Sequence, residues 1–234
     1  MRTVLITGGS RGIGAACVRR FCAAGNRGFF FYRANDEAAE TLSSETGAVA
    51  VKCDVSDPQA VEKAFSELPA FDVLVNNAGI AGFSLFQDLS EADWDRMIGT
   101  NLGGVYRCTR AVLPGMIAQK QGCIVNVSSM WGQVGASCEV AYSAAKAGVI
   151  GLTKALAKEV GPSGIRVNCI APGVIDTEMN AALSEDALAE LAEETPLGRI
   201  GTAEEIAGQI YWLTSEEASF LTGQVLGSNG GLVI

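Results

Sequence analysis

Tyr142 and Lys146 stand four residues apart in the segment 141–146, whose composition is typical of a helix. Four residues make about one helical turn, so both side chains emerge from the same face. An ammonium about 4 Å from a phenol, at an effective dielectric constant of about 20, would favour the phenolate by roughly 4 kcal/mol. That energy would lower the tyrosine pKa from about 10 by up to about three units, which gives a proton donor near neutral pH. A tyrosine and a lysine that simply pack on a helix surface would show the same spacing.

A glycine-rich turn follows the first apolar run of the chain. Its sequence is Thr7-Gly8-Gly9-Ser10-Arg11-Gly12-Ile13-Gly14, between an expected strand and an expected helix. Glycines at 8, 12 and 14 would let the backbone turn sharply and approach a pyrophosphate, which the first amides of the helix would bind. Glycine-rich turns also occur for steric reasons alone. The position between a strand and a helix nevertheless favours dinucleotide binding.

The end of the second expected strand bears on which dinucleotide is bound. It carries Arg33, and Asp36 already begins the next expected helix. An acidic residue at the end of this strand would favour NAD by bonding a ribose 2′-hydroxyl. Arg33 and Arg11 would instead neutralise a 2′-phosphate through planar, multidentate hydrogen bonds. The sequence therefore predicts NADP(H), unless both arginines are solvated surface residues.

Short apolar runs alternate with longer segments of helical periodicity. The runs are continuous, as in Phe29-Phe30-Phe31, which is typical of parallel strands covered on both faces. With right-handed crossovers this predicts one α/β domain over residues 1–234, a doubly wound Rossmann fold whose seven-stranded parallel sheet has helices on both faces. The expected strands are Thr3–Thr7, Gly28–Tyr32, Ala48–Cys53, Val73–Asn76, Cys123–Ser128, Arg166–Ala171 and Gln224–Gly227. The expected helices are Gly12–Ala24, Asp36–Thr46, Pro58–Leu68, Glu91–Gln119, Glu139–Gly161 and Ala203–Thr214, and the acidic segment 177–196 is a candidate lid.

Composition excludes several classes of function. The 234 residues carry a net charge of −9 without a basic run, so nucleic acid is not an expected partner. Histidine is absent, which removes Ser-His-Asp and Cys-His catalysis and every histidine-ligated metal site, and we expect no metal. Seven scattered cysteines without a CxxC pair indicate reduced thiols in a cytoplasmic protein. The N-terminus does not have the pattern of a signal peptide, and no apolar run approaches the ~20 residues that span a membrane.

Four separated motifs now occur together. They are the Thr-Gly-x-x-x-Gly-x-Gly turn, Asn76-Asn77-Ala78-Gly79 after the fourth expected strand, Ser128-Ser129 at the end of the fifth, and Tyr142-x-x-x-Lys146. On these motifs the chain resembles the short-chain dehydrogenase/reductase family along its whole length. The later segments 172–179, 196–201, 204–207 and 221–224 make it most similar to the branch that contains beta-ketoacyl-[acyl-carrier-protein] reductases.

The resemblance implies a role for each of these positions. Tyr142 would be the acid in carbonyl reduction, and Ser129 would hydrogen-bond the substrate oxygen. Lys146 would lower the Tyr142 pKa and hold the nicotinamide ribose. Asn101 would anchor a water that links Lys146 to a proton relay, although a helix break is the alternative reason for an Asn at this point. Asp54 would contact the adenine, or else serve as a turn or helix-capping residue. The cofactor-binding set that the resemblance implies is Gly8, Ser10, Arg11, Gly12, Ile13, Gly14, Arg33, Asp54, Val55, Asn77, Ala78, Gly79, Tyr142, Lys146, Pro172, Gly173, Ile175 and Thr177.

The expected activity is NADPH-dependent reduction of a 3-oxoacyl-[acyl-carrier-protein] in fatty acid synthesis. The first alternative is the same chemistry on a small sugar, polyol, steroid or xenobiotic carbonyl. The second is a dinucleotide-sensing protein without turnover, which would be expected to lack part of the tetrad Asn101, Ser129, Tyr142 and Lys146, all present here. The net charge of −9 works against docking an acidic carrier protein.

Two expected helices bear on assembly. Glu91–Gln119 and Glu139–Gly161 carry apolar residues on more than one face, and an exposed apolar stripe usually marks an interface. The residues in question are Val105, Val112, Met116, Val149, Leu152 and Leu156. The family resemblance implies that these helices pack between subunits of a homotetramer.

Overall fold

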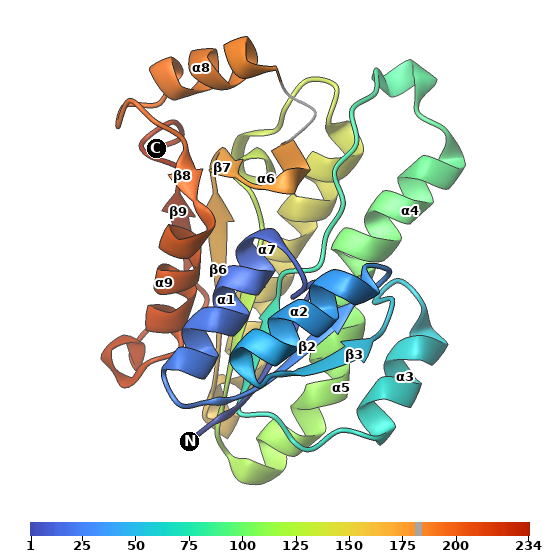
Figure 1. Ribbon diagram of the computed structural model, residues 1–234, viewed down its shortest axis with the longest axis vertical. Helices are drawn as coiled ribbons and strands as arrows, with labels where there is room; N and C mark the ends of the chain where they lie inside the picture. The colour runs from blue at the N-terminus through green and yellow to red at the C-terminus, as the bar shows by residue number, and fades with distance from the viewer. Residues whose placement is uncertain (181–183) are drawn as a thin grey trace.

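Seven strands form one parallel sheet in the order β3-β2-β1-β4-β5-β6-β9 in the computed structural model, which describes residues 1–180 and 184–234 (Figure 1). The strands are β1 (Thr3–Thr7), β2 (Arg27–Tyr32), β3 (Val49–Lys52), β4 (Val73–Asn76), β5 (Gly122–Val127), β6 (Ile165–Pro172) and β9 (Val225–Ser228). The strand order reverses between β1 and β4, where a doubly wound sheet opens a crevice at the carboxyl ends of its strands. The predicted fold class is confirmed.

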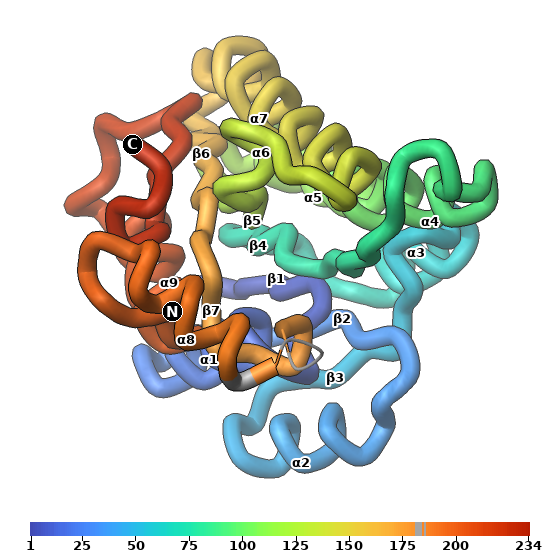
Figure 2. Tube along the Cα trace, turned by 90° about the horizontal axis from the view of Figure 1, so that it is seen from above, coloured from blue at the N-terminus to red at the C-terminus, as the bar shows by residue number. Residues whose placement is uncertain are grey.

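Helices cover both faces of this sheet (Figure 2). One face carries α1 (Gly12–Ala23), α2 (Asp36–Thr46) and α9 (Ala203–Leu213), and the other carries α3 (Pro58–Ser66), α4 (Glu91–Asn101), α5 (Gly103–Gln119) and α7 (Val140–Val160). Successive strand residues face opposite layers. Ile6 and Phe30 pack with α1 and α9, whereas Leu5 and Phe31 pack with α3 and α5. Both faces therefore need apolar side chains, which explains why the strands lack polar alternation.

Several helices begin with a side-chain cap, although α5 and α7 do not. Asp57 accepts a hydrogen bond at the start of α3, Ser90 does so for α4, and Thr202 forms a capping box with Glu205 at α9. Helix α1 differs, because Arg11 precedes it in an extended conformation and provides no side-chain cap. The first backbone amides of α1 therefore remain available to an anion.

The prediction of one continuous helix over Glu91–Gln119 is wrong at one point. The chain leaves the helix at Leu102, where α4 ends and α5 starts at Gly103. Both polar atoms of the Asn101 side chain bond the backbone of Ile80, the N–H and the C=O, each at 2.9 Å. This contact fixes the end of α4 on the loop after β4, and α5 starts at Gly103.

Several short elements were not predicted. They are α6 (Trp131–Val134), the two-stranded sheet of β7 (Ile175–Asp176) and β8 (Gly201–Thr202), and the 3-10 turns Phe86–Asp88, Gly161–Ser163, Glu178–Asn180 and Glu216–Ala218. The candidate lid at 177–196 contains the third of these turns and α8 (Glu185–Glu194), while its residues 181–183 lie outside the described residues. Its role as a lid stays a prediction.

The apolar residues that suggested an outer stripe on the long helices are mostly internal. Val105, Val112, Met116 and Val149 are buried within the chain's own core, so for these four the prediction is wrong. The reason is that α5 and α7 pack against each other as well as against the sheet. Val105 of α5 and Val149 of α7 belong to the same buried cluster, and Val112 and Met116 pack on the strands. On α5 the exposed large apolar side chains are instead Tyr106 (51%) and Ile117 (46%).

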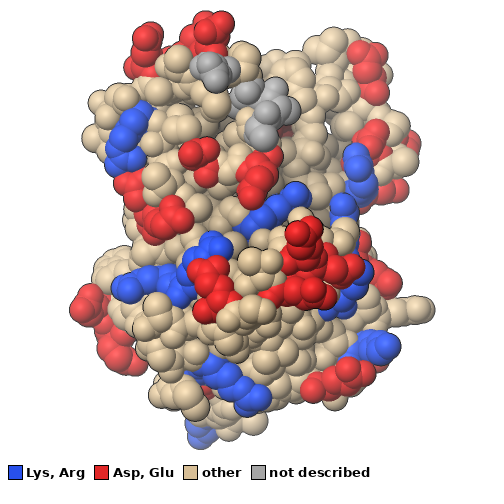
Figure 3. Space-filling model, viewed as in Figure 1, with Lys and Arg blue, Asp and Glu red and all other residues tan. Residues whose placement is uncertain are grey.

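The surface is acidic overall, with both signs of charge interspersed. On the face drawn in Figure 3, basic side chains lie among acidic ones rather than in one patch. All seven cysteines lie in the described part of the chain, and each is a free thiol. Within residues 1–180 and 184–234, no helix has the length and apolar character to cross a membrane, and no cluster of three or more potential metal ligands occurs.

Candidate active site

Tyr142 lies in the first turn of α7, facing the end of β5. Its side chain is buried, with 9% of its surface exposed, among apolar side chains that include Met97 and Ala141. Burial raises the pKa of Tyr142 to about 12, against the lowering effect of a hydrogen bond with Ser129. Ser129 directly follows the last residues of β5 and is itself 7% exposed. The structure thus places the phenol and the serine hydroxyl close to each other.

Lys146 lies one turn further along α7 and is 4% exposed. Its Nζ donates a hydrogen bond to the carbonyl of Val127 at 2.9 Å and lies 5.6 Å from the centre of the Tyr142 ring. Burial lowers the pKa of Lys146 to about 8, because an ammonium loses hydration inside the protein, while the neighbouring Cys169 acts in the opposite direction.

The expectation that Lys146 lowers the Tyr142 pKa is wrong for the protein without ligands. The phenolate would form inside an apolar cluster, and the cost of removing it from water exceeds the help that a lysine facing the Val127 carbonyl provides. Tyr142 consequently keeps its proton at neutral pH. A protonated phenol is the state that a proton donor requires.

Asn101 is fully buried beside this pair. A side chain at Gly79 would place its Cβ 2.8 Å from Asn101 Oδ1 and 3.5 Å from Lys146 Nζ, so glycine alone fits between them. Asn101 Nδ2 also lies 2.8 Å from the sulfur of Met97. Asn101 and Lys146 are therefore neighbours across Gly79. Both explanations for Asn101 remain compatible with its place, because the helix breaks directly after it.

The glycine-rich turn is tied to the end of β4. Gly8 and Gly12 have φ of +63° and +50°, a conformation that side chains disfavour. The hydroxyl of Thr7 accepts hydrogen bonds from the amides of Asn77 and Ala78 at 3.0 Å, and Asn77 Nδ2 donates to the carbonyls of Thr7 and Gly8. The Asn77 side chain is thus committed to holding the turn. The turn and the uncapped start of α1 form a preformed cradle for an anionic group.

A groove of about 460 Å³ runs from this cradle along the carboxyl ends of the strands. The predicted cofactor residues that line it are Gly8, Ser10, Arg11, Gly12, Ile13, Arg33, Asp54, Val55, Asn77, Ala78, Gly79 and Thr177. Others do not line it. Ile175 is buried in the core, and Gly173 packs against Asn229 with its N–H bonded to the Ser228 carbonyl. Gly14 and Pro172 are likewise outside the lining, as are Tyr142 and Lys146.

Asp54 makes a turn and still lines the groove. One of its oxygens accepts from the amide and the hydroxyl of Ser56, at 2.9 and 2.7 Å. The turn role that the sequence left open is therefore present.

Some groove residues were missed in the sequence. They are Phe31, Tyr32, Ala34, Asn35, Cys53, Ile80, Ala81, Thr100, Glu178 and Met179. Most of them are next to a predicted residue in the sequence. They could have been found by including every residue at the carboxyl ends of the expected strands.

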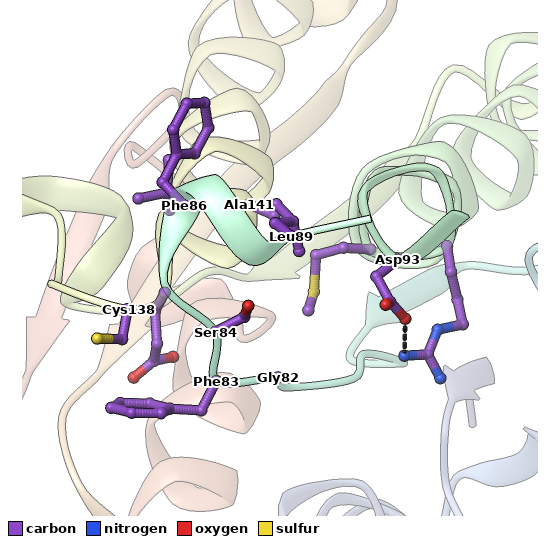
Figure 4. A pocket seen from close by; sticks show the side chains of 12 residues that line it. Gly82, Phe83, Ser84, Phe86, Leu89, Asp93, Cys138 and Ala141 are labelled. Atoms are coloured by element: carbon purple, nitrogen blue, oxygen red, sulfur yellow. Dashed lines mark hydrogen bonds and ion pairs between the residues drawn. The ribbon is translucent and has the colours of Figure 1, made fainter. Parts of the chain in front are cut away.

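A second pocket, of about 200 Å³, lies behind the tyrosine (Figure 4). Figure 4 shows Phe83 and Phe86 of the loop after β4 on one side and Asp93 of α4, paired with Arg96 at 2.7 Å, on the other. Cys138 also lines it and holds an unusual φ of +63°. Ala141 belongs both to this pocket and to the apolar cluster around Tyr142, so the pocket and the tyrosine share a wall.

The whole chain is similar to known proteins. A family model described as enoyl-(acyl carrier protein) reductase matches residues 8–233. The 3-oxoacyl-[acyl-carrier-protein] reductase FabG of Chlamydia muridarum (strain MoPn / Nigg) is 44% identical, over 99% of this chain and 97% of that protein. The acetoacetyl-CoA reductase of Shinella zoogloeoides is 45% identical, over 98% of each. The crystal structure of 3-oxoacyl-[acyl-carrier protein] reductase from Brucella melitensis ATCC 23457 superposes with a TM-score of 0.94 at 37% identity, over 100% of this chain and 91% of that one.

The chain belongs to the short-chain dehydrogenase/reductase family. It is an oxidoreductase that acts on CH–OH or C=O groups, and the family generally uses a nicotinamide dinucleotide. The groove of this short-chain dehydrogenase/reductase fits such a cofactor on two observations. The start of α1 lacks a side-chain cap at the bottom of the cradle, and two arginines line the same groove.

Proposed function

We propose that the protein is an NADPH-dependent carbonyl reductase that converts 3-oxoacyl thioesters to 3-hydroxyacyl thioesters, carried by acyl carrier protein in fatty acid synthesis. The convergence of a buried, protonated Tyr142 with Ser129 and Lys146 beside the groove that starts at the glycine-rich turn carries this proposal. The thioester substrate is supported by the names of relatives, since 3-oxoacyl-[acyl-carrier-protein] and acetoacetyl-CoA are both 3-oxoacyl thioesters.

The side chains of the site divide the proton chemistry among them. When bound, the nicotinamide supplies the hydride. Tyr142 donates its proton to the ketone oxygen. General acid catalysis of this kind typically raises the rate by about 10²–10⁴-fold. The hydroxyl of Ser129 hydrogen-bonds the same oxygen and stabilises the negative charge that develops on it. The Lys146 ammonium then stabilises the phenolate that Tyr142 leaves behind, and Asn101 lies where a returning proton would pass.

The preference for NADPH over NADH rests on the far end of the groove. Arg33 follows β2 and Arg11 stands in the glycine-rich turn, and both line the groove. Two guanidinium groups there suit a 2′-phosphate, whose charge and planar bonding they match. The cradle at the start of α1 would hold the pyrophosphate, and Asp54 and Val55 would face the adenosine end.

Coenzyme A is the competing carrier. Acetoacetyl-CoA reductases are as similar to the chain as the carrier-protein enzymes are, and a net charge of −9 opposes docking of an acidic carrier protein. Acetoacetyl thioesters of acyl carrier protein and of coenzyme A, offered with NADPH at matched concentration, separate the two. We expect the larger kcat/KM with the carrier-protein thioester. A larger value with the coenzyme A thioester would assign the other carrier.

The same panel tests the reaction class. It includes small sugars, polyols, steroids and diketones, on which we expect kcat/KM to be lower. A preferred sugar or diketone would contradict the thioester proposal. NADPH binding without turnover of any carbonyl would instead indicate a dinucleotide-sensing protein.

We also propose a homotetramer of single-domain subunits spanning residues 1–234 that works in the cytoplasm. The exposed Tyr106 and Ile117 of α5 support an interface on that helix, since residues 106, 110, 113 and 117 follow one face at helical spacing. Seven free thiols support a reducing compartment.

A further inference from the structure

Two residues near the end of β5 contact the backbone of Lys146 rather than its ammonium. The hydroxyl of Ser128, which is 3% exposed, donates a hydrogen bond of 2.8 Å to the Lys146 carbonyl in the middle of α7. Gly132 of α6 lies on the same spot. A Cβ added to it would come within 2.7 Å of Ser128 Oγ, 2.8 Å of the Lys146 carbonyl carbon and 2.9 Å of Lys146 Cβ.

Lys146 is therefore held at its ammonium and at its backbone carbonyl by two consecutive residues, the last residue of β5 and the one that follows it. Its Nζ donates to the carbonyl of Val127 at 2.9 Å, and its backbone carbonyl accepts from Ser128. The next side-chain contact between β5 and α7 is two turns further on, where Asn126 Nδ2 donates to the Thr153 hydroxyl at 2.9 Å. The contact at Ser128 and Gly132 is thus the one nearest to Tyr142, and Ser129 follows Ser128 directly.

We propose that Ser128 and Gly132 form a seat for α7 and are positioning residues that set the place of Lys146, and through it of Tyr142, relative to Ser129. This inference rests on the proposed function of the same site. The Ser128 hydroxyl fixes the position of α7 along the direction of β5. The absence of a side chain at Gly132 sets the distance between α6 and the backbone of α7. Neither residue lines the groove.

The size of the effect follows from the contact distances. Gly132 has a helical backbone, so alanine at this position would meet no backbone strain. Its Cβ would instead have to push the Lys146 backbone away by several tenths of an ångström, because contacts under 3.0 Å to backbone are not tolerated. A misplacement of about 1 Å in an enzyme site can cost about 10²-fold in rate. We expect at least a tenfold loss of kcat.

The decisive test compares Gly132→Ala with Gly151→Ala. Gly151 lies on α7 itself, and a Cβ there would meet no atom within 4 Å. The readouts are kcat, the dissociation constant of NADPH from fluorescence, and the deuterium isotope effect on kcat with NADPH labelled at the transferred hydrogen. For Gly132→Ala we expect kcat to fall at least tenfold, NADPH to bind several-fold more weakly and the isotope effect to change. Gly151→Ala should match the wild type in all three.

A second variant keeps the test valid if Gly132→Ala does not fold. Ser128→Ala adds no atom and removes only the hydroxyl, and Ser128→Cys restores a weak donor of similar shape. We expect kcat to fall for Ser128→Ala and to recover partly for Ser128→Cys. The matched control is Thr214→Val, which removes another buried hydroxyl that donates to a backbone carbonyl at 2.8 Å, next to α9 on the opposite face of the sheet.

The outcomes separate structure from positioning. A loss of folded protein lowers kcat in proportion to the folded fraction but leaves the isotope effect unchanged, and Thr214→Val should behave in that way. The proposal is overturned if Gly132→Ala and Ser128→Ala keep kcat within twofold of the wild type with an unchanged isotope effect. If the wild type binds NADPH but reduces no carbonyl, the proposed function fails, and the NADPH dissociation constants of the Gly132→Ala and Gly151→Ala pair still decide whether the seat exists.

Discussion

Burial decides the protonation of the two residues at the centre of the site. Tyr142 is held in its neutral form by the apolar cluster of Met97 and Ala141, and Lys146 is made easier to deprotonate by the same loss of hydration. Both shifts move in the direction that disfavours charge. A ligand-free site of this kind contains a proton donor with its proton in place and a cation whose charge depends on pH near 8.

Replacing the phenol tests the acid role of Tyr142. We expect Tyr142→Phe to lower kcat by at least about 10²-fold, because general acid catalysis contributes roughly that much. The NADPH dissociation constant should stay within twofold, since the ring is retained. Tyr106→Phe, on the exposed face of α5, serves as the matched control and should leave kcat unchanged. More than about a tenth of wild-type kcat in Tyr142→Phe would exclude this role.

The depressed pKa of Lys146 predicts a pH dependence. The titratable groups that face it are Tyr142 and Cys169, and burial raises the pKa of Cys169 to about 11. Lys146 is therefore charged below a pH of about 8 and neutral above it. We expect kcat/KM for carbonyl reduction, which reports the free enzyme, to fall as pH rises through about 8. Lys154→Ala, on the exposed side of α7, should show the same profile as the wild type.

The same group affects stability with the opposite sign. Between pH 8, near its folded pKa, and pH 10.5, the ordinary lysine pKa, Lys146 binds its proton in the unfolded chain but not in the folded one. The free energy of unfolding should therefore gain a contribution from this residue as pH rises over that interval. Urea unfolding at several pH values, compared between the wild type and Lys146→Met, measures it. An equal slope in both proteins would show that the pKa of Lys146 is not lowered in the folded protein.

Arg33 tests the choice of cofactor. Hydrogen bonds to a charged group are worth about 1.5–3 kcal/mol, so Arg33→Ala should lower the ratio of kcat/KM for NADPH over NADH by roughly 10–100-fold. Arg27 lies at the other end of β2, and Arg27→Ala should keep the wild-type ratio. A wild-type preference for NADH would mean that both arginines at the groove are surface residues.

At the scale of elements, apolar runs in the sequence predicted the strands well, whereas features that depend on long-range contacts were not predicted. The bounds of β1 and β4 agree with the prediction, because each is a short apolar run that is buried on both faces. The sequence offered a helix break only as one of two explanations for Asn101, because the contact with Ile80 that accounts for it spans 21 residues of the chain. The short α6 and the β7–β8 pair likewise form through tertiary contacts that leave no periodic pattern.

The two ends of α4 separate stability from activity. Asn101→Ala would remove the side chain that bonds the part-buried N–H and C=O of Ile80, which should lower the free energy of unfolding by about 1–3 kcal/mol. It should also lower kcat, because Asn101 is next to Lys146 across Gly79. Ser90→Ala removes the cap at the other end of α4 and should cost about 1 kcal/mol with no change in kcat. Urea unfolding and kcat are measured on both variants. An equal loss of kcat in Asn101→Ala and Ser90→Ala would contradict a role of Asn101 in activity.

At the scale of the whole molecule, the sheet order determines where the site lies. β1, β4 and β5 are adjacent, so the glycine-rich turn, the Asn77 segment and Ser129 meet at one edge although up to 120 residues separate them. Motifs in the sequence were enough to name these segments. They did not reveal that Asn77 is committed to the turn, or that burial raises rather than lowers the Tyr142 pKa, because both depend on neighbours that come from distant parts of the chain.

Assembly is testable on the intact protein. We expect light scattering to give about four times the chain mass of 24.3 kDa. Ile117→Lys should shift the protein to smaller species, because it places a charge on the exposed apolar face of α5. Lys63→Glu, on the exposed side of α3, serves as a surface control. A monomer at micromolar concentration would contradict the tetramer.

The glycine-rich turn joins β2 through one backbone bond, from the Gly9 N–H to the Phe31 carbonyl at 2.9 Å, but the loop beyond β2 is held by other side chains. The turn is held by Thr7 and Asn77, whereas the loop after β2 ends in Asn35, whose side chain caps α2. Substitutions can therefore accumulate in the loop after β2 while the glycine-rich turn keeps its conformation. A descendant of this protein could exchange its source of reducing power, from the biosynthetic pool to the catabolic one, through a few changes at Arg33 and its neighbours. Its chemistry at Tyr142 would be inherited unchanged.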